Sequence, residues 1–145
     1  MNRLGLVGGL GPESTIDYYR RIIDGWTEMY PGSLPSVLID SLDVNRGIEL
    51  VRKDHAALAD YLLESVRRLH RAGCDFAAMA ANTPHLVFDR VASRAPIPML
   101  SIVETAAAAC TAAGHRRVGL LGTGFTMGAP FYPDTFARHG IEVAV

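Results

Sequence analysis

The residues of this sequence that could bind a polar ligand gather in four short segments, and each segment follows an apolar run. The first is Gly8-Gly9-Leu10-Gly11-Pro12-Glu13-Ser14-Thr15, where glycines allow close approach of a ligand and a helix N-terminus would favour an anion. Ser14 stands where a dinucleotide-binding motif has its third glycine, so a dinucleotide site has little support. A carboxylate site that includes Gly9 and a purely structural turn are both left open.

One cation and two hydroxyls stand out in the second and fourth segments. Arg46 follows the apolar run that ends at Ile39, and its guanidinium could bind a carboxylate through two hydrogen bonds. The alternative is a solvated surface arginine. Thr123 and Thr126 lie between Gly122 and Gly128, where hydroxyls could hold a carboxylate or serve as ordinary turn and cap formers.

The third segment, Ala81-Asn82-Thr83-Pro84-His85, is the most informative of the four. Asn82 and Thr83 could cap the following helix, and that structural role suffices for either residue alone. Together with His85 they form a polar cluster at a strand end, which is where ligands bind in parallel α/β sheets. His85 taken alone is ambiguous.

The elements that would position these segments alternate along the whole chain. Short aliphatic runs are separated by helical stretches of ten or more residues, and this pattern predicts an α/β fold with a parallel sheet flanked by helices. The predicted strands are Leu4 to Val7, Ser36 to Ile39, Phe76 to Met79, Met99 to Ile102, Val118 to Leu121 and Ile141 to Val145.

Three helices have a recognisable apolar pattern. The helix that opens at Pro12 should bury a face made of Ile16, Tyr19, Ile22, Ile23 and Trp26. The helix over residues 55–72 should bury Leu58, Leu62, Val66 and Leu69. The helix over residues 103–113 consists largely of alanine, which suggests tight packing against a neighbouring element.

Two lobes are expected. Residues 1–102 would form a complete first lobe, and residues 103–145 a connecting helix and the start of a second, similar lobe. The run Val118-Gly119-Leu120-Leu121-Gly122 repeats the appearance of the opening strand, but the strands after it are too few to close a sheet. The sequence therefore suggests a truncated chain.

Composition narrows the class of partner. Fourteen basic and fifteen acidic residues give a net charge of −1 without a run of like charges, so neither nucleic acid nor a membrane surface is an expected partner. A cytoplasmic location and a small-molecule ligand are expected instead. The only cysteines, Cys74 and Cys110, have no metal-ligand spacing and are expected to be buried thiols, with no metal site.

Taken in order, the segments that begin at Gly8, Ala81 and Leu121 resemble the cofactor-independent aspartate/glutamate racemase family, and the match spans the chain. The resemblance implies an isomerase that removes and returns the α-proton of an acidic or other small amino acid without pyridoxal phosphate (PLP) or any other cofactor. It implies that Asn82, Thr83 and Thr126 hold the α-carboxylate and that Arg46 meets a side-chain carboxylate. Family members commonly pair, so a homodimer is one assembly to consider.

Position 81 departs from the family pattern. The family uses two facing cysteines, and the first immediately precedes the Asn-Thr-x-His segment, where this chain has Ala81. A methyl group cannot take a proton, and Cys74 and Cys110 lie elsewhere in the sequence. The second cysteine belongs to a Cys-Thr-Glu segment that is not among these 145 residues.

Two readings follow from this departure. The first is an amino-acid racemase homologue that is inactive as this chain alone. The second is a binding or regulatory protein that keeps the carboxylate site, for an amino acid or a dicarboxylate, and has lost proton transfer. A nucleotide-binding fragment is a distant third.

Overall fold

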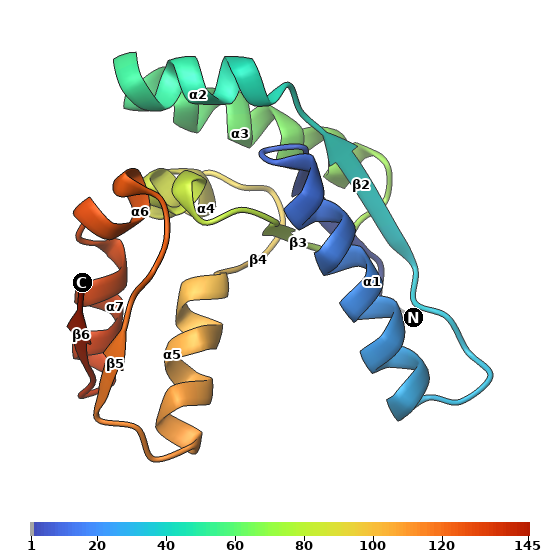
Figure 1. The fold of residues 1–145 in the computed structure, drawn as a ribbon. Helices are drawn as coiled ribbons and strands as arrows, with labels where there is room; N and C mark the ends of the chain where they lie inside the picture. Colours follow the sequence, from blue (N-terminus) through green and yellow to red (C-terminus); the bar gives the residue numbers. More distant parts are fainter. Residues whose placement is uncertain (1) are drawn as a thin grey trace.

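The structure is a computed structural model that describes residues 2–145. Four parallel strands form its main sheet in the order β2(Val37–Ser41), β1(Leu4–Gly8), β3(Phe76–Met79), β4(Met99–Leu100). A second, two-stranded sheet pairs β5(Arg117–Gly119) with β6(Glu142–Ala144), also in parallel (Figure 1). The predicted α/β fold with a parallel sheet is confirmed.

Helices connect the strands. In chain order they are α1(Pro12–Met29), α2(Val44–Lys53), α3(His55–Arg71), the 3-10 helix η1(Thr83–Val87), α4(Phe88–Ala92), α5(Ile102–Ala112), α6(Gly124–Gly128) and α7(Phe131–Arg138). Within residues 2–145 none of them is long and apolar enough to span a membrane. Helix α2 is not among the predicted helices; it begins where the Asp43 carboxylate accepts hydrogen bonds from the Asn45 and Arg46 N–H groups.

The strand ends differ from the prediction where a polar side chain starts the next element. The fourth strand stops at Leu100, two residues earlier than predicted, because the Ser101 hydroxyl accepts a hydrogen bond from the Glu104 N–H (3.3 Å) and caps α5. The second strand instead extends through Asp40 and Ser41. The helix predicted after Asn82 is divided into η1 and α4.

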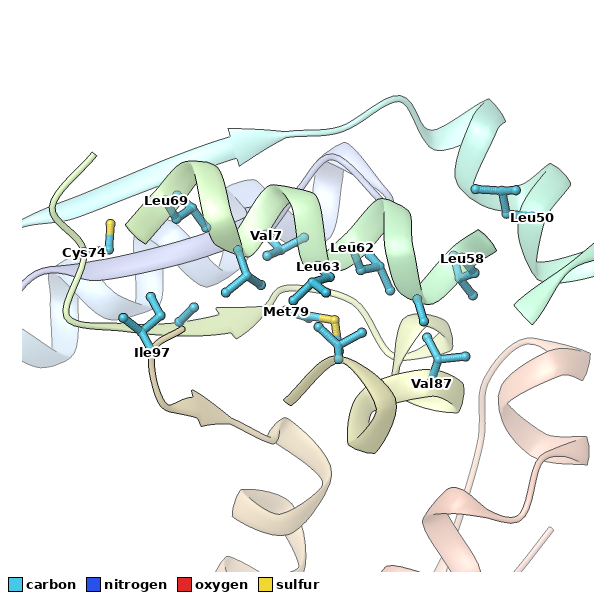
Figure 2. Close-up of a cluster of buried hydrophobic side chains, with 14 of the residues drawn as sticks. Val7, Leu50, Leu58, Leu62, Leu63, Leu69, Cys74, Met79, Val87 and Ile97 are labelled. Atoms are coloured by element: carbon cyan, nitrogen blue, oxygen red, sulfur yellow. The ribbon is translucent and has the colours of Figure 1, made fainter. Parts of the chain in front are cut away.

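Helix α3 forms the centre of the core. Leu58, Leu62, Val66 and Leu69 are fully or almost fully buried, as their spacing predicted. Figure 2 shows Leu58, Leu62 and Leu69 in a row along α3, beside Val7 of β1, Met79 of β3 and Val87 of η1. The α3 face of the sheet is therefore well covered.

Helix α1 covers the opposite face less completely. A methyl group on Gly8 would meet Thr15 of α1, whereas one on Gly5, three residues earlier, would meet Leu69 of α3, so the two helices lie on opposite faces. The burial predicted for the apolar face of α1 is wrong for Ile16 and Tyr19, which are 51% and 43% exposed, whereas Ile22, Ile23 and Trp26 are half-buried. Eighteen helical residues span about 27 Å and five strand residues about 17 Å, so the helix extends past the sheet.

The last third of the chain packs around a smaller core. Val103 and Ala107 of α5, Phe136 of α7 and Ile141 are its buried residues. Figure 1 shows α5 leading from the end of β4 toward the loop before β5. The tight packing predicted for the alanines of α5 is wrong for Ala108 and Ala109, which are exposed.

Candidate functional site

A cavity of about 290 Å³, lined by both polar and apolar side chains, lies where the segment after β3 meets the loop after β5 and the start of α7. We call it the Asn82 cavity. Its lining includes Ala81, Asn82, Thr83, Thr123, Thr126 and Tyr132. In the described part of the chain, every side chain that lines it is uncharged. The structure thus brings five residues of the predicted site, from two distant segments, to one place.

Ala81 is a buried lining residue of this cavity, and backbone hydrogen bonds fix its position. The neighbouring Ala80 N–H donates to the Val7 carbonyl of β1 (2.9 Å), which continues the sheet pairing past the end of β3. The Ala81 carbonyl accepts a hydrogen bond from His85 Nδ1 (2.9 Å). Only 7% of Ala81 is exposed, so its methyl group is part of the wall beside Asn82.

Asn82 does not act as the helix cap that the sequence allowed. Its side chain makes no capping bond to η1, and its Oδ1 instead accepts a hydrogen bond from the Tyr132 hydroxyl (2.6 Å). Burial and the nearby Tyr18 raise the pKa of Tyr132, which keeps this phenol protonated at neutral pH. The Asn82 amide nitrogen makes no hydrogen bond within residues 2–145 and is available to a ligand.

Three threonines add hydroxyl groups to the wall. Thr123 caps α6: its Oγ1 accepts from the Thr126 N–H (3.3 Å) and lies 3.2 Å from the Thr126 Oγ1. Turn formation, the structural alternative for this segment, is therefore part of their role. The Thr83 hydroxyl, in contrast, has no hydrogen-bond partner among the residues that the structure describes.

His85 lies behind the cavity rather than in its lining. Its Nδ1 donates to the Ala81 carbonyl, and its Nε2 accepts from the Ile102 N–H (3.4 Å) at the start of α5. Its ring is stacked on Phe88. Burial lowers the pKa of His85 to about 4, although its backbone hydrogen bonds act in the opposite direction. A neutral imidazole therefore joins the Ala81 segment to α5.

Arg46 and Gly9 do not line the Asn82 cavity. Arg46 lies in the first turn of α2, where it forms an exposed ion pair with Glu49 (2.8 Å), so its role in binding a carboxylate stays a prediction. Gly9 has φ +82°, and a methyl group there would lie 2.3 Å from the Leu42 carbonyl oxygen. Backbone crowding thus accounts for this glycine.

Three polar residues of the cavity, Ser14, Tyr18 and Tyr132, are not among the predicted site residues, although Ser14 belongs to the first of the four segments. Ser14 and Tyr18 are four residues apart in α1, a spacing that places side chains on the same helix face. The Ser14 hydroxyl lies 2.8 Å from the Ala80 carbonyl and ties α1 to the end of β3. Tyr132 follows the fourth segment in the sequence, but only the fold brings α7 to Asn82.

Neither cysteine lies near Ala81. Cys74 is buried in the main core beneath α3, where desolvation raises the pKa of its thiol. Cys110 is half-buried against the smaller core. The serine, threonine and tyrosine hydroxyls of the cavity have high intrinsic pKa values, and burial raises those of Tyr18 and Tyr132 further. In the described chain, the cavity lining thus includes no base that is effective at neutral pH.

Comparisons with known proteins agree on one family. Residues 7–145 match the profile of the Asp/Glu/Hydantoin racemase family. The chain is 27% identical, over 148 aligned residues, to the broad specificity amino-acid racemase RacX of Bacillus subtilis; the match covers 97% of this chain and 63% of that protein.

Two solved structures have the same fold. An aspartate racemase homologue from Pyrococcus horikoshii is 37% identical with a TM-score of 0.91, and all of this chain superposes on 64% of it. A putative Asp/Glu racemase from Yersinia pestis is 33% identical with a TM-score of 0.92, and 99% of this chain covers 64% of it. The chain therefore spans somewhat less than two thirds of the length of these relatives.

Proposed function

Because this chain belongs to the Asp/Glu/Hydantoin racemase family, we propose that its Asn82 cavity binds the carboxylate and ammonium groups of an amino acid without moving the α-proton. The observation that carries the proposal is the meeting of Ala81 with Asn82, Thr83, Thr123 and Thr126 in one cavity. The polar groups suit an amino-acid ligand, and the residue beside them has no acid-base chemistry.

Binding rests on hydrogen bonds from neutral groups. The free Asn82 amide and the Thr83 hydroxyl can donate to a carboxylate, and hydroxyl or carbonyl oxygens can accept from an ammonium. Hydrogen bonds to charged groups contribute about 1.5–3 kcal/mol each. Two such bonds contribute about 3–6 kcal/mol toward binding without an arginine in the cavity.

Proton transfer is the step that the cavity lacks. A general base must lie within hydrogen-bond reach of the proton that it removes, and the α-proton of an amino acid is only weakly acidic. The Ala81 methyl group faces the cavity at the position where the family resemblance expects a thiolate. The reaction of the relatives, as their names give it, is thus proposed for this chain only in part: binding without racemisation.

The proposal is tested by measuring binding and exchange side by side. Titration calorimetry with L- and D-amino acids, aspartate and glutamate among them, should detect binding, while NMR in deuterated water should detect no α-proton exchange. Exchange by the unchanged chain would favour the alternative, a working racemase that uses another base.

A variant pair tests whether Asn82 holds the ligand. Asn82→Ala should weaken binding about tenfold or more, because it removes a hydrogen bond to a charged group. Asn45→Ala is the matched control, since Asn45 is exposed on α2 and does not line the Asn82 cavity. If Asn82→Ala and Asn45→Ala bind the amino acid equally tightly, the ligand does not contact Asn82.

Restoring the thiol tests the role of position 81. Ala81→Cys should introduce α-proton exchange on at least one enantiomer, because it places a sulfur in the cavity wall. Ala80→Cys is the control: Ala80 is the adjacent, equally buried alanine and does not line the cavity. Binding without any exchange in Ala81→Cys would mean that the loss of activity involves more than the thiol.

A further inference from the structure

A second and larger cavity adjoins the Asn82 cavity. Its volume is about 650 Å³, and Leu10, Thr83 and Thr123 line both cavities. It lies between α2, the start of α3, η1 and α6, on the side of Thr83 away from Tyr132. A ligand held at Thr83 and Thr123 would therefore lie at the boundary between the two cavities, and the size of the second is typical of small-molecule sites.

The walls of this second cavity are apolar, and we call it the apolar cavity. Val44, Ile48 and Val51 of α2, Leu58 of α3, Pro84 of η1 and Phe125 of α6 provide most of its surface. Leu58 and Val51 are buried, whereas Ile48 and Phe125 are each about half exposed and form its outer part. Contact of this surface with a hydrocarbon side chain is favourable because it removes apolar area from water, whereas contact with a charged group is not.

One charged residue of the described chain, Arg52, also lines the apolar cavity. Arg52 lies in the last turn of α2 and is an exposed residue. The predicted partner of a side-chain carboxylate, Arg46, lies outside and is paired with Glu49. An acidic side chain in the apolar cavity would thus lose its hydration against hydrocarbon walls, which is unfavourable without a buried counter-charge.

From this geometry we infer that the apolar cavity receives the ligand's side chain, so that the preferred ligands are amino acids with bulky aliphatic or aromatic side chains. The inference rests on the proposed function, since the Asn82 cavity must hold the carboxylate and ammonium groups. The family resemblance implied an acidic or other small amino acid as the ligand. The cavity instead favours leucine, methionine, phenylalanine and amino acids with similar side chains. Thr83 and Thr123 stand at the junction, where the α-carbon would lie.

Calorimetry with a graded series of ligands tests the inference. The full chain is titrated with alanine, leucine, methionine, phenylalanine, aspartate and glutamate, each as both enantiomers. Leucine, methionine or phenylalanine should bind at least about tenfold more tightly than alanine, because a buried side chain of that size gains this much affinity. Aspartate and glutamate should bind no more tightly than alanine.

A matched pair of variants locates the side chain. Ile48→Glu places a charge in the apolar cavity and should weaken leucine binding at least tenfold while leaving alanine binding within about twofold. Ile16→Glu is the control, since Ile16 on α1 is similarly exposed (51% against 45%) and lines neither cavity. Phe125→Ala changes another exposed part of the cavity wall and should also weaken leucine binding. This second variant keeps the test valid if Ile48→Glu fails to fold.

The outcomes separate this inference from the proposed function. If aspartate or glutamate binds most tightly and Arg52→Gln abolishes that binding, Arg52 selects an acidic side chain. This result would overturn the inference but not the proposed function. Equal affinities across the series, or an Ile48→Glu variant that binds leucine normally, would overturn it as well. No binding of any amino acid would overturn the proposed function itself, and the inference with it.

Discussion

At the scale of single residues, His85 shows how a polar group beside a cavity can serve position rather than chemistry. Both ring nitrogens form hydrogen bonds with backbone groups: Nδ1 donates to the Ala81 carbonyl, and Nε2 accepts from the Ile102 N–H. The Asn-Thr-Pro-His pattern predicted a polar cluster at a strand end, and Asn82 and Thr83 do reach the cavity. The sequence left the role of the histidine open, because only burial and hydrogen-bond partners distinguish a ligand-binding ring from a structural one.

The titration of His85 should be visible in protein stability. Its pKa falls from 6.5 to about 4 on folding, so the unfolded chain binds more protons between these values. The stabilising contribution is complete above pH 6.5 and decreases as the pH falls toward 4. It amounts to roughly 3 kcal/mol over that range.

Urea denaturation of the unchanged chain and of His85→Asn at pH 7.0, 5.5 and 4.0 measures this contribution. The stability difference between the two proteins should shrink by roughly 3 kcal/mol from pH 7 to pH 4, since only one of them carries the titrating ring. His70→Asn is the control, because His70 is exposed on α3. A difference that is constant with pH would mean that His85 remains accessible to protons.

At the scale of elements, apolar periodicity predicted α3 correctly and α1 only in part. The stripe of α3 is buried because three strands, α2 and η1 all pack on it. The stripe of α1 has the same periodicity, yet Ile16 and Tyr19 are exposed, since a pattern states that a face is apolar but not what covers it. Strand ends were likewise set by caps such as Ser101, which depend on the following helix.

The central place of α3 predicts a large mutational effect. Leu62→Ala should lower the free energy of unfolding by about 2–5 kcal/mol, because Leu62 is fully buried and little can collapse into the space. Glu64→Ala, two residues on, removes surface ion pairs with Arg67 and Arg71 and should cost no more than about 1 kcal/mol. Chemical denaturation monitored by circular dichroism compares them, and equal losses would contradict the assignment of α3 as the centre of the core.

At the scale of the whole molecule, the candidate site lies where two regions of unequal size meet. Fifteen buried residues form the core around α3, and four form the one around α5 and α7. The sequence predicted the division at about residue 102 from a weak repeat, and this boundary stays a prediction. Contacts such as Tyr132 with Asn82, fifty residues apart, could not be predicted, because no local pattern encodes which loops meet.

This inequality predicts unequal protection of the two sheets in hydrogen exchange. Segments with few buried apolar contacts open at lower free energy than the main core, so the amides of β5 and β6 should exchange faster than those of β1, β3 and α3. Mass spectrometry of native exchange should show a difference of at least about tenfold in rate.

An amino acid that contacts both Thr83 and Thr123 links the two regions, and its addition should slow exchange around residues 117–128 more than in α3. Equal rates in both regions, with or without ligand, would instead mean that the chain opens as a single cooperative unit.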